Sequence, residues 1–146
     1  MDFYTGKGFN QLRVDEAFEN SWTMTETHLV LGAGLFNDFN PLHVNQHFAA
    51  NSRFGGRIAH GYLTSNAMAA LLGMVFHSTA IAYVEHSIRF TNPVRAGDTL
   101  TICWVVSQLD AKPKLEGGLV TLTGTCVNSD GTEVARAEAK MLVHDA

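Results

Sequence analysis

The sequence has the length and composition of one globular domain. It has 146 residues, of which 46% are hydrophobic and 16% are charged, so it carries enough apolar material to bury a core. The formal net charge of −4 comes without a cluster of Lys and Arg, which argues against a protein that binds nucleic acid or an anionic membrane. We therefore expect a small molecule or another protein as the partner.

The first residues and the cysteines favour a cytoplasmic protein. Residues 1–7 lack a basic segment followed by an apolar run, so the sequence predicts neither a secretory signal nor a membrane span. Cys103 and Cys126 are too far apart for a Cys-x-x-Cys unit, and each lies in an apolar, strand-like run. Such positions are typical of reduced, buried thiols.

One strand and several helices are expected in the first half of the chain. Residues 1–16 indicate no more than a surface lead-in, and residues 17–24 favour a strand. A helix is expected over about 26–36, with Thr23-x-x-Glu26 as a capping box or Thr25 as the alternative cap. A further short helix is expected over 44–52.

The longest predicted helix covers residues 62–76. After Asn66 it is apolar on all sides, which indicates a helix that the rest of the protein encloses. The remainder of the chain alternates apolar and polar residues, as strands with one buried face do. These strands are expected over 82–90, 100–106, 119–127 and 135–143, with a polar loop over 110–118 and a hairpin turn over 128–131.

The order of these elements predicts the fold class. The connections between the later strands are too short for the crossovers that a parallel sheet requires. The alanines of the last strand, which share one face, leave room for a helix to lie close. We therefore predict an α+β fold in which an antiparallel sheet curls around one long helix, as a single domain over residues 1–146.

Residues 33–45 crowd an acid, an imidazole and two amides around one proline. Pro41 fixes its own φ and keeps Asn40 out of helical geometry. Asp38 and His43 are therefore expected in a bent loop that turns both side chains toward one point. An acid and a base that share one water could add it across a polarised double bond, or remove it. The alternative is that Asp38 only closes a turn or caps a helix while His43 is a structural group.

The start of the long helix offers a second element of a site. Gly61 lies where backbone N–H groups are free and the helix dipole is positive, and without a Cβ it lets a ligand carbonyl come close. Such a donor would form an oxyanion hole for the enolate of a thioester, typically worth about 3 kcal/mol of barrier. The alternative for His60-Gly61 is a plain start of a helix after a sharp turn.

These residues resemble the signature of a known family. The family is that of the MaoC-like (R)-specific enoyl-CoA hydratases, which have the hotdog fold. The similar run is Asp38-Phe39-Asn40-Pro41-Leu42-His43-Val44-Asn45, followed seventeen positions after His43 by His60-Gly61. The later runs Asn92-Pro93-Val94 and Ala96-Gly97-Asp98 are also similar to family members, so the resemblance covers most of the chain.

The resemblance implies a role for each matching position. Asp38 and His43 would hold and activate the water, and the Gly61 N–H would bind the thioester oxygen. Asn40 and Asn45 would pin the loop by satisfying backbone groups that the proline bend leaves open. The family adds water reversibly, in the syn sense, to a trans-2-enoyl thioester and so forms the (R)-3-hydroxyacyl product.

The resemblance also implies the partners. The substrate would be an acyl-CoA thioester or its acyl carrier protein equivalent, and no metal or redox cofactor is expected. Family members are commonly dimers whose sheets join edge to edge, so a homodimer or a dimer of dimers is expected. The resemblance and the charge together favour neither nucleic acid nor a membrane as partner.

One departure from the family pattern lies beside the loop. Family members usually have a small residue and Gly immediately before the catalytic Asp, where this chain has Phe36-Asn37. Asn is a non-Gly residue that tolerates left-handed backbone, so the turn itself is expected to survive. Phe36 could narrow the acyl pocket or pack in the core. We place Phe36, and also His60 beside Gly61, among the residues that bind the substrate or surround the site.

Two other functions remain open from the sequence. One is a hotdog acyl-CoA thioesterase, against which the Asp-x-Asn-Pro-x-His loop argues. The other is a non-catalytic acyl-CoA-binding subunit whose pocket Phe36 and Asn37 have closed. His43 and His47 have a spacing that can bind metal on a helix, but they lack an adjacent Glu and a third ligand. His86 is expected to be a core histidine bonded to a neighbour.

Overall fold

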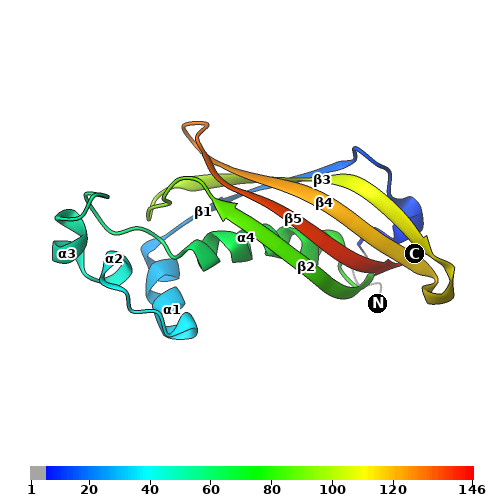
Figure 1. The fold of residues 1–146 in the computed structure, drawn as a ribbon, viewed down its shortest axis with the longest axis horizontal. Coiled ribbons are helices and arrows are strands. Elements are labelled where there is room, and N and C mark those ends of the chain that lie inside the picture. Colours follow the sequence, from blue (N-terminus) through cyan, green and yellow to red (C-terminus); the bar gives the residue numbers. More distant parts are fainter. Residues whose placement is uncertain (1–5) are drawn as a thin grey trace, which may run out of the picture.

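In a computed structural model, which describes residues 6–146, a five-stranded antiparallel sheet curls around one long helix (Figure 1). The order of the strands in the sheet is β1-β3-β4-β5-β2. This confirms the predicted α+β class. The helices are α1 (Glu26–Phe36), α2 (Pro41–Val44), α3 (Gln46–Ala50) and α4 (Gly61–Val75), and the strands are β1 (Ala17–Thr23), β2 (Ala80–Phe90), β3 (Thr99–Lys112), β4 (Gly117–Asn128) and β5 (Glu133–His144).

The alternation of apolar residues sets the inner face of the sheet. Every second residue of β3 from Leu100 to Val106 is fully buried, and the corresponding residues of β5 from Ala135 to Val143 are at most 8% exposed. Trp104 of β3 lies directly opposite Gly124 of β4, where a Cβ would lie 2.7 Å from the indole ring. Gly124 therefore makes the space that the largest buried side chain needs.

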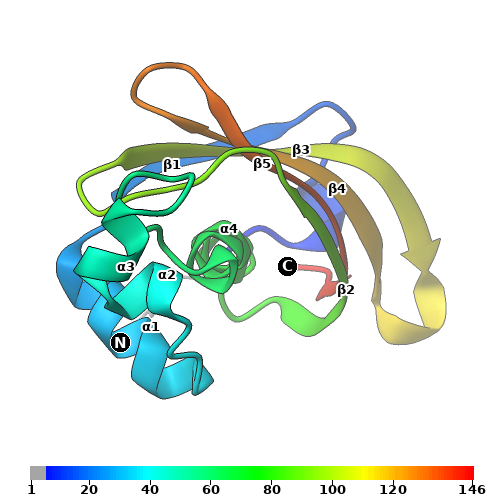
Figure 2. The same ribbon diagram turned by 60° about the vertical axis from the view of Figure 1, so that its left-hand side comes forward.

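The sheet covers α4 along one side only. Trp104 Nε1 donates a hydrogen bond to the main-chain oxygen of Met68, 2.9 Å away, which ties the sheet to the middle of the helix. The expectation that α4 is enclosed on all sides is wrong for the single chain, because Tyr62 is 69% and Met74 59% exposed. Figure 2 shows the same geometry end-on, with α4 inside the curve of the sheet and α1, α2 and α3 beside it.

Helix α1 begins and ends as expected, and its N-cap is Thr25, the second of the two predicted caps. The Thr25 N–H donates to Nδ1 of His28 at 2.9 Å, so the capping box uses His28 and not the Thr23-x-x-Glu26 pattern. A Cβ on Gly32 would lie 3.1 Å from the Leu63 side chain, and this glycine therefore lets α1 approach α4 closely.

Three further segments differ from the prediction. The helix expected over 44–52 is two short helices, α2 and α3, separated by Asn45. The polar loop expected over 110–118 is shorter, because β3 continues to Lys112 and β4 begins at Gly117. Residues 6–16 are more than a surface lead-in, since Leu12 is buried in the core and the Lys7 N–H donates to the Val75 carbonyl at 2.8 Å.

Two other expectations concern membrane spans and the thiols. Across residues 6–146, none of the helices combines the length and the apolar character needed to cross a membrane. Cys103 and Cys126 are both free, and only Cys126 is fully buried. The sequence interpretation of residues 1–5 lies outside the described residues.

Candidate active site

The loop after α1 turns sharply at Asn37. Asn37 is the C-cap of α1 and has a left-handed backbone, with φ of 55° and ψ of 36°. The Asp38 N–H then donates to the Ala33 carbonyl at 3.1 Å, which closes the last turn of the helix. Asn in place of the more usual Gly therefore preserves the turn, as expected from its tolerance of this conformation.

Asp38 uses its two carboxylate oxygens differently. Oδ1 accepts a hydrogen bond from the Asn40 N–H at 3.1 Å, which forms the Asx turn of the structural alternative. Oδ2 lies 3.9 Å from Nε2 of His43, and the carboxylate side chain is 45% exposed. The turn and the proposed chemistry therefore use different oxygens of one side chain.

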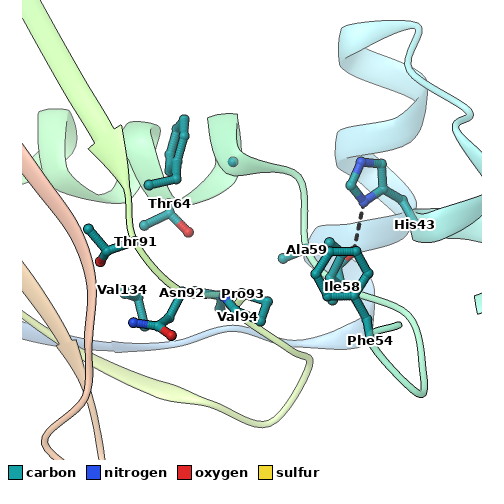
Figure 3. A pocket seen from close by; sticks show the side chains of 12 residues that line it. His43, Phe54, Ile58, Ala59, Thr64, Thr91, Asn92, Pro93, Val94 and Val134 are labelled. Atoms are coloured by element: carbon teal, nitrogen blue, oxygen red, sulfur yellow. Dashed lines mark hydrogen bonds between the residues drawn. The ribbon is translucent and has the colours of Figure 1, made fainter. Parts of the chain in front are cut away.

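His43 is oriented by a hydrogen bond on its other ring nitrogen. Nδ1 donates to the carbonyl oxygen of Ile58 at 2.7 Å, the bond drawn in Figure 3. When the ring is neutral, this bond places the hydrogen on Nδ1 and leaves the lone pair of Nε2 facing Asp38. The gap of 3.9 Å between Nε2 and Oδ2 is too long for a direct hydrogen bond, but it suits one water that bonds to both atoms.

Two asparagines hold the loop that carries His43. Oδ1 of Asn40 accepts from the Leu42 N–H at 3.0 Å and caps α2, with Pro41 at the first helical position. Oδ1 of Asn45 accepts from the Phe48 N–H at 2.9 Å and caps α3. Both amides therefore satisfy backbone groups around the proline bend, in the manner that the sequence predicted.

Gly61 begins α4 next to the loop. As the first residue of the helix it presents an N–H group without a partner inside the helix, at the positive end of the helix dipole. A Cβ at this position would lie 2.9 Å from the ring of Phe90. Glycine therefore lets the Phe90 side chain of β2 come close to the start of α4.

Gly61 and His43 both line a cavity of about 370 Å³. Figure 3 shows His43 at one end of this cavity and Thr91 and Val134 at the other. The sequence reasoning missed most of the far wall, because it is built from residues that follow β2 and from β5. The remaining lining residues are Phe54, Ile58, Ala59, Thr64, Phe90, Asn92, Pro93 and Val94.

Phe36 lies away from this cavity. Its ring packs edge-on against His60, with 5.7 Å between the ring centroids, and against Tyr62 at 6.2 Å. It is not among the residues that line the cavity. Phe36 is half-buried and lies outside the buried core cluster, so it packs against these two rings and not in the core.

Asp38, His43 and His60 are close enough to suggest a metal site, but their orientation does not suit one. One ligand atom from each residue lies within 4.8 Å of the other two. The two imidazoles are stacked, with 3.9 Å between their centroids and 29° between their planes. A metal ion lies in the plane of each imidazole that binds it, and two nearly parallel planes at this spacing do not meet at a bonding distance. His47 is exposed and lies outside this group.

His86 forms a separate hydrogen-bonded group on the inner side of β2. Its Nε2 lies 2.9 Å from Oγ of Ser65 and its Nδ1 lies 2.7 Å from the Tyr83 hydroxyl. Burial lowers the pKa of His86 and raises the pKa of Tyr83 to about 12. The sequence prediction of a histidine bonded to its neighbours is confirmed, but His86 is half-buried and does not belong to the buried core. Neither Ser65 nor Tyr83 lines the cavity.

The fold and the loop together define a hotdog-fold protein with an acid and a base beside a helix N-terminus. A family model described as a MaoC like domain matches residues 10–125. The (R)-specific enoyl-CoA hydratase of Rhodospirillum rubrum is 35% identical over 135 residues, which cover 92% of this chain and 90% of that protein. The chain belongs to the MaoC-like family.

Two further relatives agree with this membership. The 3-hydroxybutyryl-CoA dehydratase of Methylorubrum extorquens is 38% identical over 77 residues, which cover 53% of this chain and 49% of that protein. The unliganded R-hydratase PhaJ1 of Pseudomonas aeruginosa superposes with a TM-score of 0.85 at 29% identity, over 97% of this chain and 88% of that one.

Proposed function

We propose that the protein is an (R)-specific enoyl-CoA hydratase, a hydro-lyase that adds water reversibly to a trans-2-enoyl thioester. The observation that carries the proposal is that the Asp38 carboxylate faces Nε2 of His43 across a gap that suits one water, and that His43 and Gly61 line the same cavity. Two relatives are named for hydration or dehydration of acyl-CoA thioesters.

The proposed reaction uses the two elements of the site together. The thioester oxygen accepts a hydrogen bond from the Gly61 N–H, which withdraws electrons from the double bond and makes C3 electrophilic. The water between Asp38 and His43 gives a proton to this pair as its oxygen bonds to C3, and the pair then delivers that proton to C2 of the enolate. Because both side chains stand on one side of the substrate, the hydroxyl and the hydrogen are added to the same face.

The N–H group matters most where negative charge develops. Attack at C3 moves an electron pair toward the thioester oxygen and forms an enolate. A fixed donor at that oxygen is worth about 3 kcal/mol in the transition state. The proposed reaction is a proton transfer coupled to addition, so it requires no metal or redox cofactor, and coenzyme A or acyl carrier protein enters only as part of the substrate.

The proposed assembly is a homodimer that joins its sheets edge to edge through β2. This strand is at the edge of the sheet, and its apolar residues Ile81, Val84 and Phe90 are 39%, 52% and 49% exposed. Edge strands with exposed apolar residues pair readily with another chain. A second copy would also cover part of the open side of α4.

Hydration of crotonyl-CoA, followed as the loss of enoyl absorbance, tests the proposed function. Asp38→Asn and His43→Gln keep the size of each side chain and remove the acid or the base, so we expect each to lower kcat by at least about 10²-fold, in the range of acid–base catalysis. His47→Gln, an exposed histidine four residues from His43, is the matched control and should retain wild-type kcat.

The same samples separate the other functions of this fold. Release of free thiol from acyl-CoA without hydration would identify a thioesterase. Tight binding of acyl-CoA with no turnover would identify a binding subunit. Full hydratase activity in either Asp38→Asn or His43→Gln would show that this pair is not the catalytic one.

A further inference from the structure

His60 is the most deeply buried polar side chain next to the site. It is 1% exposed, and it precedes Gly61 as the N-cap of α4 without capping that helix through its side chain. Its Nε2 lies 2.9 Å from the main-chain oxygen of Asp38. The residue that leads into the proposed oxyanion donor therefore also holds the backbone of the proposed acid.

The hydrogen bonds of His60 fix its tautomer. The Asp38 carbonyl oxygen can only accept, so Nε2 carries the hydrogen and donates it. Nδ1 is buried and finds no hydrogen-bond partner within residues 6–146. A buried imidazole nitrogen without a hydrogen-bond partner costs folding free energy, which an apolar ring of similar size would not. The bond to Asp38 thus points to a role beyond filling volume.

The ring of His60 is also fixed between two other rings. One face stacks on His43, with 3.9 Å between the centroids and 29° between the planes. Phe36 presents its edge at 5.7 Å and 76°. Two contacts therefore hold the His43 ring in different ways. The hydrogen bond to the Ile58 carbonyl fixes the direction of its nitrogens within the ring plane, and the stacked His60 ring fixes the tilt of that plane.

We propose that His60 is a positioning residue that sets Asp38 and His43 relative to the Gly61 N–H. It touches neither water nor substrate in this role. It acts on Asp38 through the hydrogen bond to the main chain, on His43 through the stacked ring, and on Gly61 through the peptide that joins them. The proposal rests on the proposed hydratase function, because it assigns the geometry of that reaction to one buried side chain.

Two substitutions of His60 separate the hydrogen bond from the stacked ring. His60→Gln places an amide N–H near the position of Nε2 and keeps the donor to Asp38, whereas His60→Phe keeps a flat ring against His43 and loses the donor. A displacement of about 1 Å at reacting groups can lower the rate by about 10²-fold. We expect kcat to fall by about 30- to 100-fold in His60→Phe and by less than about tenfold in His60→Gln, with KM within about twofold in both.

The matched controls are His47→Phe and His47→Gln, which make the same changes at an exposed histidine of α3. Thermal unfolding of all variants separates a loss of fold from a loss of geometry. If His60→Phe fails to fold, Phe36→Leu replaces it. That substitution releases one side of the His60 ring and leaves the hydrogen bond intact, and we expect it to lower kcat by about three- to tenfold with unchanged KM.

Nitrogen NMR of the wild-type histidine rings tests the proposal without any activity. We expect His60 to show a protonated Nε2 and a bare Nδ1. The ring chemical shifts of His43 should change between wild type and His60→Gln, which removes the stacked ring. A protonated Nδ1 on neutral His60 would overturn the proposal. So would wild-type kcat in folded His60→Phe, or in Phe36→Leu if His60→Phe does not fold. A wild-type protein that hydrates no enoyl thioester would refute the proposed function instead, while the ring spectra would still decide the role of His60.

Discussion

Replacement of Gly61 by alanine is the sharpest test of the start of α4. The added Cβ would lie 2.9 to 3.1 Å from three atoms of the Phe90 ring, where an ordinary carbon–carbon contact is about 3.5 to 4.0 Å. The ring must therefore retreat by about 0.5 to 1 Å. Phe90 is 49% exposed, so it can move toward solvent, and alanine gains about 1 kcal/mol of helix propensity over glycine.

These terms predict a variant that folds but turns over slowly. We expect the free energy of unfolding of Gly61→Ala to stay within about 1 kcal/mol of wild type, because the displaced ring and the gain in propensity oppose each other. We expect the methyl group to hinder the approach of the thioester oxygen to the N–H, so the variant should lose most of the roughly 3 kcal/mol of proposed oxyanion stabilisation. That loss corresponds to about a 10²-fold decrease in kcat/KM for crotonyl-CoA.

The double variant Gly61→Ala/Phe90→Leu distinguishes two causes of that loss. Leucine at position 90 relieves the contact with the ring but leaves the methyl group in the path to the N–H. We therefore expect urea unfolding to recover any lost stability, and the hydration assay to remain about 10²-fold below the Phe90→Leu single variant. Recovery of activity in the double variant would assign the defect to the ring, and wild-type activity in Gly61→Ala would refute the oxyanion role.

Three other predictions concern parts of the fold away from the cavity. Asn37→Val should lower the free energy of unfolding by about 1–2 kcal/mol in urea, because a β-branched residue is strained at φ of 55°, whereas Asn37→Gly should be close to neutral. Burial lowers the pKa of His86 in the folded protein. As the pH falls through the ordinary histidine pKa of about 6.5, the unfolded chain therefore binds a proton that the folded chain does not, and the free energy of unfolding decreases. The urea midpoint of His86→Gln should fall less between pH 7 and 5 than that of wild type, and an equally large fall would contradict this origin. Burial raises the pKa of Cys126 to about 11, so a thiol reagent at pH 8 should modify it only after unfolding, and rapid labelling of the native protein would count against the buried position.

The strands were predictable because their signals are local. In β5 the small and apolar residues from Ala135 to Met141 alternate with charged ones, and this local pattern is enough to predict a strand with one buried face. Pro41 and the two asparagines likewise define the bend of the loop by their own chemistry. The proximity of Asp38 and His43 follows from that bend, which is why the sequence alone could bring them together.

The rest depends on contacts between distant segments. The far wall of the cavity needs Val134 to meet the residues after β2, and no local pattern in either segment signals this meeting. The side of α4 that stays open is as apolar as the buried side, so composition predicts enclosure on both. The role of His28 in the capping box was missed because its imidazole accepts the hydrogen bond that a carboxylate or amide usually accepts at this position.

In the proposed reaction, the separate roles of the two Asp38 carboxylate oxygens have a consequence for the motion of the loop during turnover. Oδ1 is engaged by the Asn40 N–H in the turn, and only Oδ2 faces His43. A proton can therefore arrive at and leave Oδ2 without breaking the bond that shapes the loop. The backbone around Pro41 need not rearrange between successive turnovers, so the loop can stay rigid while its charge alternates.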